Sequence, residues 1–402
     1  MASDGISGED LADADGFETA TVLTRLGRKP SAYHGFVNTP VFRGSTVLFP
    51  DAETLESRAV EYTYGRPSNP TSREIETALA SLEGGARTFM PPSGLSAIST
   101  TLLAFAEAGG HMLIVDSAYF PTRRFASRVL KRMGVNVEYY DPQIGAGIAA
   151  LIRPETKLVL TESPGSQTFE VQDIPAICKA ARGAGVPVAI DNTWGTPLYF
   201  PAFEYGVNIS IQSCTKYIVG HADALLGAII CDEPAAAAVA GAHEAYGLCA
   251  NGEDCFLALR GLRTLGVRMA RHWQSGLEMA AWLRARPEVA QVLHPALPGA
   301  PGYELWKRDF KGAAGLFSIT LKPYPKKAVQ RMLNALEIFG MGYSWGGFES
   351  LIIPFDVAHA RTATAWKPEG PALRLHIGLE DVEDLKRDLQ RGFAALAIAA
   401  NA

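Results

Sequence analysis

The chain has 402 residues, of which 48% are hydrophobic and 20% are charged. This composition is typical of a globular protein and is too apolar for a disordered one. The 37 Lys and Arg residues against 42 Asp and Glu give a net charge of −5, which offers no general attraction to nucleic acid or to an anionic membrane. The longest apolar runs, such as residues 224–231, fall far short of the roughly 20 residues that a membrane-spanning helix needs.

The N-terminal region predicts neither a secretory signal nor a compact unit. Residues 1–18 are small, polar and acidic, and the first basic residue is Arg25, so an apolar signal core is missing and a mobile tail is expected. Residues 19–66 have weak periodicity and many turn residues, which predicts an extended arm. The five cysteines form no paired or metal-type pattern, which favours free thiols in a reducing compartment and a cytoplasmic location.

Residues 67–259 alternate between short apolar runs and helical segments. Nearly continuous apolar strands are typical of a parallel sheet covered by helices on both faces, so we expect a mostly parallel, doubly wound α/β domain. The predicted helices include Pro121–Met133 and Ile174–Ala184. The predicted strands are His111–Asp116, Val135–Tyr140, Lys157–Glu162, Val186–Asp191, Asn208–Ser213 and Leu226–Cys231.

Residues 260–402 predict a smaller α+β domain. The pattern there indicates a long helix over Arg260–Arg284, followed by a mixture of strands and helices. The expected strands are Gly315–Leu321, Leu351–Phe355 and Leu373–Leu379, and the expected helices are Lys326–Glu337 and Asp381–Leu396. The predicted division of the chain is therefore an acidic tail and arm (1–66), a large cofactor-binding domain (67–259) and a small C-terminal domain (260–402).

Two reactive side chains follow the ends of successive predicted strands. Asp191 ends one strand, and Lys216 follows the next one 25 residues later, at the edge where α/β sheets bind ligands. Taken alone, Asp191 is readily explained as a helix cap and Lys216 as a surface lysine. Together they suit pyridoxal phosphate, which needs a lysine for a Schiff base and an acid that keeps its pyridine nitrogen protonated.

The same region offers a cradle for a phosphate group. The segment 91–98 has Ser93 and Gly94 directly before a predicted helix, and backbone amides at a helix start bind phosphate. Ser213 and Thr215 supply hydroxyl groups just before the lysine. On its own the Ser93-Gly94 pair is as well explained by an ordinary strand-to-helix turn, but its place before Asp191 and Lys216 favours a phosphate site.

These motifs, in this order, resemble the Cys/Met metabolism family of fold-type I pyridoxal-phosphate enzymes. The similarity extends from about residue 21 to the C-terminus. Its segments are 64–71 (YGRPSNPT), 93–97 (SGLSA), 191–194 (DNTW), 213–217 (SCTKY) and 374–381 (RLHIGLED). The resemblance implies a large α/β domain with an N-terminal arm and a closing C-terminal domain. It also implies pyridoxal 5′-phosphate, a small sulfur amino acid as substrate, and a homotetramer built from dimers that share active sites.

The resemblance also implies a role for each matching residue. Lys216 would bind the cofactor and shuttle protons, and Asp191 would pair with the pyridinium. The expected phosphate ligands are the Gly94 and Leu95 amides, the Ser213 and Thr215 hydroxyls, and Tyr64 and Arg66 from a neighbouring subunit. Tyr119 would stack on the cofactor ring and Arg374 would bind the substrate α-carboxylate, although a core tyrosine and a structural ion pair are the alternatives.

The segment 343–350 (YSWGGFES) bears on the reaction. The β-lyases of the family resemble it in having a tryptophan at the position of Trp345, where γ-acting members have a small aliphatic residue. The resemblance therefore implies α,β-elimination, with Tyr343, Ser344 and Trp345 contacting substrate, unless the two aromatics belong to the core. A cysteine-S-conjugate β-lyase, a γ-lyase and a cofactor-bound regulator without activity remain alternatives.

Two further features receive no site role at this point. The run 162–167 (ESPGSQ) lacks the Asn-Pro that many family members have, so a contact to the cofactor's phenolic oxygen is unassigned. The histidines, such as His221, His272 and His376, have no metal-ligand spacing and are expected to be structural.

Overall fold

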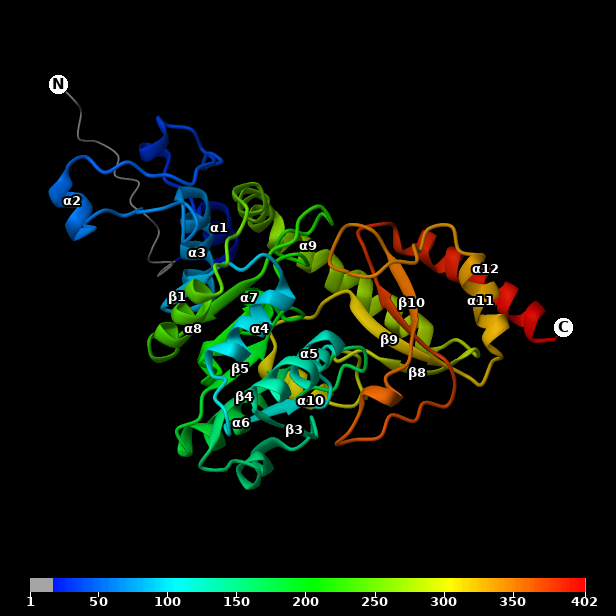
Figure 1. Ribbon diagram of the computed structural model, residues 1–402. Helices are drawn as coiled ribbons and strands as arrows, with labels where there is room; N and C mark the ends of the chain where they lie inside the picture. The colour runs from blue at the N-terminus through cyan, green and yellow to red at the C-terminus, as the bar shows by residue number, and fades with distance from the viewer. Residues whose placement is uncertain (1–16, 402) are drawn as a thin grey trace.

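The computed structural model describes residues 17–401 and contains two β-sheets (Figure 1). The larger sheet has seven strands in the order β1-β7-β6-β5-β4-β2-β3, and β2 to β6 run parallel to one another. This confirms the predicted mostly parallel α/β fold. The strands are β1 (Arg87–Phe89), β2 (His111–Val115), β3 (Asn136–Tyr140), β4 (Thr156–Glu162), β5 (Val188–Asp191), β6 (Ile209–Gln212) and β7 (Ala228–Cys231).

The strands of this sheet form because their apolar side chains are covered on both faces. Every residue of β2, β6 and β7 is buried, as a parallel sheet between helical layers requires. The helices that accompany the sheet are α3 (Pro70–Glu83), α4 (Gly94–Ala104), α5 (Phe120–Phe125), α6 (Ile174–Gly183), α7 (Thr196–Tyr199) and α8 (Glu233–Ala245). The predicted helix 121–133 is interrupted, because α5 passes into a π-helical turn (Ala126–Leu130) and a 3₁₀ turn (Lys131–Met133).

Strand β7 runs antiparallel to its neighbours β6 and β1. The chain between β6 and β7 contains no crossover helix of the kind that a parallel connection needs. Residues 213–227 instead turn back along the same edge of the sheet, and this return segment contains Lys216.

The 33-residue helix α9 (Gly252–Arg284) connects the larger sheet to a four-stranded antiparallel sheet. Figure 1 shows α9 passing from one sheet to the other. Leu262 and Leu265 of α9 belong to the core of the larger sheet, whereas Met279 and Leu283 belong to the second core. The helix begins eight residues before its predicted start, and the predicted division at 259/260 falls within it. The smaller sheet contains β8 (Val289–Leu293), β9 (Leu316–Leu321), β10 (Leu351–Phe355) and β11 (Ala372–His376).

Side chains of β11 alternate between two environments, as the two-residue period of a strand dictates. Leu373 and Leu375 pack in the second core, which includes apolar residues of α11 (Lys326–Asn334) and α12 (Val382–Ala400). Arg374 and His376 are also buried, but they contact the segment 342–347. The strand therefore presents two basic side chains to the loop that approaches Lys216.

The N-terminal segment contains α1 (Thr19–Arg25) and α2 (Ala52–Ser57), and α10 (Tyr303–Asp309) precedes β9. Several large apolar side chains between residues 36 and 64 are exposed, among them Phe36 and Leu48. The predicted acidic tail falls mainly on residues 1–16, outside the described part of the chain. Within residues 17–401, no helix is both long and apolar enough to cross a membrane.

Candidate functional site

The carboxyl ends of β4, β5 and β6 meet at one edge of the larger sheet. Glu162 pairs in register with Asp191, and Asp191 pairs with Ile211 one strand further on. The segment 213–217 follows directly. The strand-end reasoning from the sequence therefore places Asp191 and Lys216 at the same edge, as expected for a ligand site of this fold.

Asp191 is held by hydrogen bonds that favour its charged form. Its Oδ1 accepts from the Thr193 hydroxyl at 2.5 Å and from the Thr193 backbone N–H at 3.1 Å. Burial raises the pKa of Asp191, and these bonds together with the nearby Lys216 charge oppose that increase. Thr193 Oγ1 also accepts from the backbone N–H of Ser213 at 2.9 Å, so Asp191 is fixed relative to the lysine segment.

The Lys216 amine lies in a half-buried position against the segment 343–347. Its Nζ donates to Ser344 Oγ at 2.5 Å and lies 5.3 Å from the centroid of the Trp345 ring. Burial and the Arg374 charge lower the pKa of Lys216 to about 8, although Asp191 opposes the shift. An amine with that pKa exchanges protons readily near neutral pH.

The start of α4 lies directly beside Ser213. A Cβ added to Gly94 would lie 2.4 Å from Ser213 Oγ, so only glycine allows this approach. Ser93 caps the helix by accepting from the Ser96 N–H, and the first amides of a helix have no partner within it. The Thr215 hydroxyl donates to the Leu226 carbonyl at 3.2 Å and accepts from the Leu226 N–H at 3.0 Å.

Arg374 is buried, and its guanidinium has a hydrogen-bond donor without a partner in the described chain. Its Nη2 donates to the Ser344 carbonyl at 2.9 Å, but its buried Nε has no hydrogen-bond partner. Within residues 17–401 no carboxylate forms a salt bridge with it, so the structural ion pair suggested as an alternative is not found there. A buried guanidinium without an acidic partner is suited to bind a carboxylate from outside the chain.

The remaining predicted site residues differ in their exposure and in their contacts. Tyr119, which precedes α5, is 43% exposed, and partial burial together with the nearby Asp191 carboxylate raises its pKa. Tyr343 is 91% exposed, which is incompatible with a core aromatic in this chain. Tyr64 is 48% exposed, and the only hydrogen bond found for Arg66 within residues 17–401 is a 3.5 Å contact with the Glu244 carbonyl.

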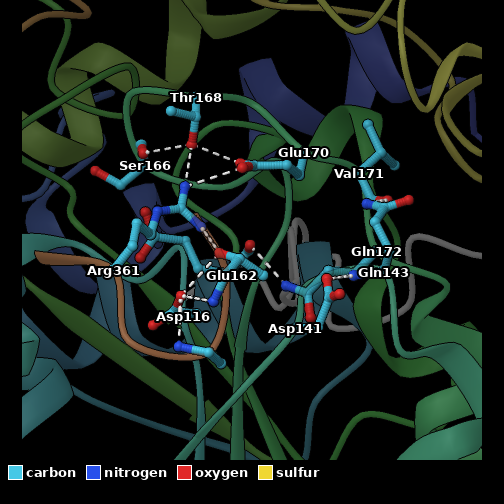
Figure 2. A network of polar contacts seen from close by, with 12 residues as sticks. Asp116, Asp141, Gln143, Glu162, Ser166, Thr168, Glu170, Val171, Gln172 and Arg361 are labelled. Carbon is cyan, nitrogen blue, oxygen red and sulfur yellow. Dashed lines mark hydrogen bonds and ion pairs between the residues drawn. The ribbon is translucent and has the colours of Figure 1, made fainter. Parts of the chain in front are cut away.

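Glu162 is a site residue that the motif comparison missed. Its Oε2 accepts from the Tyr119 backbone N–H at 2.7 Å, and burial together with Asp191 raises its pKa well above the ordinary value. The signal was present, because Glu162 ends the predicted strand 157–162 just as Asp191 ends the next. Figure 2 shows Glu162 beside Arg361, which donates to Glu170 at 2.9 Å.

The buried carboxylate, the amine of lowered pKa and the amide cradle suit pyridoxal phosphate on a fold-type I scaffold. The fit is supported by the absence of room for a Cβ at Gly94 and by the unpaired Nε of Arg374. The chain belongs to the Cys/Met metabolism PLP-dependent enzyme family, whose sequence model matches residues 20–394. Its cofactor is therefore pyridoxal phosphate.

Individual relatives cover nearly the whole chain. A Rhizobium johnstonii protein named "Putative cystathionine beta-lyase" is 51% identical over 93% of this chain and 96% of its own. Cystathionine beta-lyase MetC of Escherichia coli is 41% identical (94% and 98% covered), and an L-alanine/L-glutamate racemase of Wolbachia pipientis is 40% identical (94% and 97%). The crystal structure of metB from Corynebacterium glutamicum superposes with a TM-score of 0.88 at 28% identity, covering 95% and 99%.

Proposed function

We propose that this enzyme is a carbon–sulfur lyase that cleaves L-cystathionine with water into L-homocysteine, pyruvate and ammonia. The observation that carries the proposal is the position of Trp345, whose ring centroid lies 5.3 Å from the Lys216 amine. The γ-acting enzymes that this chain resembles have a small aliphatic residue at that position. Relatives named cystathionine beta-lyase support the same reaction. Cystine and S-substituted cysteines, which also have sulfur on Cβ, are expected as further substrates.

The proposed cofactor ligands surround the strand ends. The Lys216 amine would bind the aldehyde group of the cofactor, and Asp191 would pair with its pyridine nitrogen. Gly94, Leu95, Ser213 and Thr215 are proposed to hold the phosphate; for Thr215 this means giving up its donation to the Leu226 carbonyl. Tyr119 would stack on the ring. When bound, pyridoxal phosphate supplies an electron sink that accepts the electron pair left by the Cα proton.

The chain itself positions the substrate and moves its protons. Arg374 binds the α-carboxylate through its free guanidinium edge, and Ser344, Trp345 and Tyr343 line the substrate side. The Lys216 amine, which the substrate amine displaces from the cofactor, would then remove the proton from Cα. Lys216 or Tyr119 then protonates the thiolate that leaves Cβ.

We further propose that the enzyme is a cytoplasmic homotetramer built from dimers. The exposed side chain of Tyr64 and the single long hydrogen bond of Arg66 among the described residues fit a role in which each arm reaches the phosphate of a neighbouring subunit. The division into arm, cofactor domain and closing domain belongs to the same proposal.

Product analysis with L-cystathionine tests the proposed reaction. Pyruvate and homocysteine in equal amounts are expected. Formation of 2-oxobutyrate and cysteine would instead assign γ-elimination. Release of neither pair, with racemisation of L-alanine or L-glutamate in the same preparation, would assign the chemistry named for the Wolbachia relative, and no turnover of any of them would favour a regulator.

Lys216→Ala provides the control for the cofactor site. This variant should lose both activity and the visible absorbance band of the bound cofactor. A band that persists in the variant would show that another residue binds the cofactor.

A further inference from the structure

His376 is a completely buried side chain that contacts the segment next to the catalytic lysine. It lies two residues after Arg374 on β11 and faces the same way, away from the second core. Its Nε2 lies 3.1 Å from the backbone nitrogen of Gly346 and 3.1 Å from the carbonyl oxygen of Gly347. In one tautomer Nε2 accepts from the Gly346 N–H, and in the other it donates to the Gly347 carbonyl oxygen, so in both it holds the backbone of the Gly346-Gly347 pair.

The segment that His376 holds rests directly on Lys216. Gly346 has a φ of 85°, and a Cβ there would lie 2.9 Å from the carbonyl carbon of Lys216. Ser344, a non-glycine residue, has a φ of 78°, a conformation that costs energy and persists only when neighbours enforce it. Ser344 and Trp345 are the two residues of this segment that contact the Lys216 amine.

The surroundings of His376 keep its ring uncharged. Burial lowers its pKa well below the ordinary value, and the positive charges of Arg374 and Lys216 act in the same direction. The rings of His272 and Tyr217 lie 5.2 and 5.9 Å from its centroid. His376 therefore contributes a neutral hydrogen-bonding atom at a fixed place and does not act as a charge.

We propose that His376 is a positioning residue: it holds the segment 344–347 on the backbone of Lys216 and thereby fixes Ser344 and Trp345 against the lysine amine. Arg374 fixes the carbonyl of Ser344 from the same strand face, so β11 aligns the substrate carboxylate site and the lysine environment together. The inference rests on the proposed role of Lys216 as the cofactor lysine, but not on which sulfur amino acid is cleaved.

Two substitutions that differ in reach test this role. In His376→Gln the amide extends to the position of Nε2, whereas in His376→Asn it reaches only that of Nδ1. The measurements on the holoenzyme are kcat, KM and the pH midpoint of the visible cofactor band. We expect His376→Asn to lower kcat at least about tenfold and to shift the midpoint by about one pH unit, whereas His376→Gln stays within about threefold of wild type.

His294→Gln is the matched control. His294 is another buried histidine, bonded through Nδ1 to the Ala296 N–H and not in contact with the lysine segment, so its loss should lower the urea midpoint without moving the cofactor band. The proposal is overturned if His376→Asn and His376→Gln behave alike, or if His376→Asn only loses stability or fails to fold. Failure of the cofactor assignment is seen separately, as a band that survives in Lys216→Ala.

Discussion

Glu162 and Asp191 end neighbouring strands in the same register, yet their surroundings differ. Burial raises the pKa of both carboxyl groups. Asp191 has the Thr193 donors and the Lys216 charge to stabilise its carboxylate, whereas Asp191 itself raises the pKa of Glu162 further. When two carboxyl groups lie side by side, ionising both costs free energy because the two negative charges repel, so one tends to keep its proton. Asp191 is the one suited to hold charge, and Glu162 is suited to hold the Tyr119 backbone as a neutral acid.

This difference predicts how stability depends on pH in the cofactor-free protein. The folded chain keeps a proton on Glu162 that the unfolded chain releases above about pH 4.5. Stability from this group is therefore full at low pH and falls as the pH rises toward the raised folded pKa. Glu162→Gln removes that loss. The urea midpoint of the variant minus that of wild type should therefore be larger at pH 8 than at pH 5.

The control is Glu204→Gln, at an exposed carboxyl whose nearest cation, Lys311, is also exposed at 3.5 Å. Its midpoint relative to wild type should be the same at both pH values. Equal differences for Glu162→Gln at pH 5 and pH 8 would show that Glu162 is ionised in the folded state.

At this scale the sequence predicts residues that end strands and misses those positioned by tertiary contacts. Asp191 and Lys216 come together because both follow parallel strands. The partnership of Lys216 with Ser344 joins positions 128 residues apart, and no local pattern encodes it. His376 was predicted to be structural because it lacks ligand spacing, and its contact with the segment 344–347 depends on how two sheets are packed.

A loop near the C-terminus is fastened to the larger sheet by one carboxylate. Asp116, which follows β2, accepts from the backbone N–H groups of residues 362, 363 and 364 at 2.8 to 3.2 Å. It also forms a buried salt bridge at 2.8 Å with Arg123. Figure 2 shows Asp116 near Arg361, the residue that precedes these three. The turn that leads to Tyr119 begins at Asp116, so the residue that holds the loop is connected directly to the candidate site.

Replacing this carboxylate should therefore destabilise the fold. Asp116→Asn leaves the buried Arg123 without its counter-charge and weakens three backbone bonds, so we expect a loss of about 3 kcal/mol in the free energy of unfolding. Urea denaturation measures it. The matched control is Asp173→Asn, which removes a half-exposed pair with Arg308 while keeping a good helix cap, and should cost less than about 1 kcal/mol. Equal costs would contradict the interpretation of the loop as fastened by Asp116.

Among the elements, long apolar runs were predictable and short or coupled ones were not. Each of the six predicted strands of the larger domain is present, with ends shifted by up to two residues. Strand β1 has three residues and β8 has a mixed sequence (VAQVL), so neither produces a pattern distinct from a loop. The reversal of β7 was also not predicted, because strand direction depends on the connection and not on the composition of the strand.

The N-terminal segment 36–64 exposes several large apolar side chains. Leu48 is 88% exposed, and Phe36 and Tyr64 are exposed near it in sequence. Apolar side chains gathered in one exposed segment are typical of a protein interface. A second copy of the chain is the occupant that the proposed shared site requires.

Mixing two inactive variants tests whether sites are shared. In a dimer of Lys216→Ala with Arg66→Ala, one site combines an intact lysine from one subunit with an intact arginine from the other. Random reassortment should therefore restore about a quarter of wild-type activity. Each variant alone and an unmixed pair after the same treatment are the controls. Mixtures no more active than the controls would place both residues in the site of a single subunit.

Helix α9 has a consequence for how this molecule can change over evolution. Its 33 residues form a rod of about 50 Å that enters both cores, and Arg268 in its middle donates to the carbonyls of Tyr217 and Ile218 directly after Lys216. Inserting one residue into the helix would advance everything beyond it by about 1.5 Å and rotate it by about 100°. Arg374 would then no longer face Lys216. The two halves of this enzyme are therefore not exchangeable modules, and insertions should be tolerated in surface loops and not at the junction.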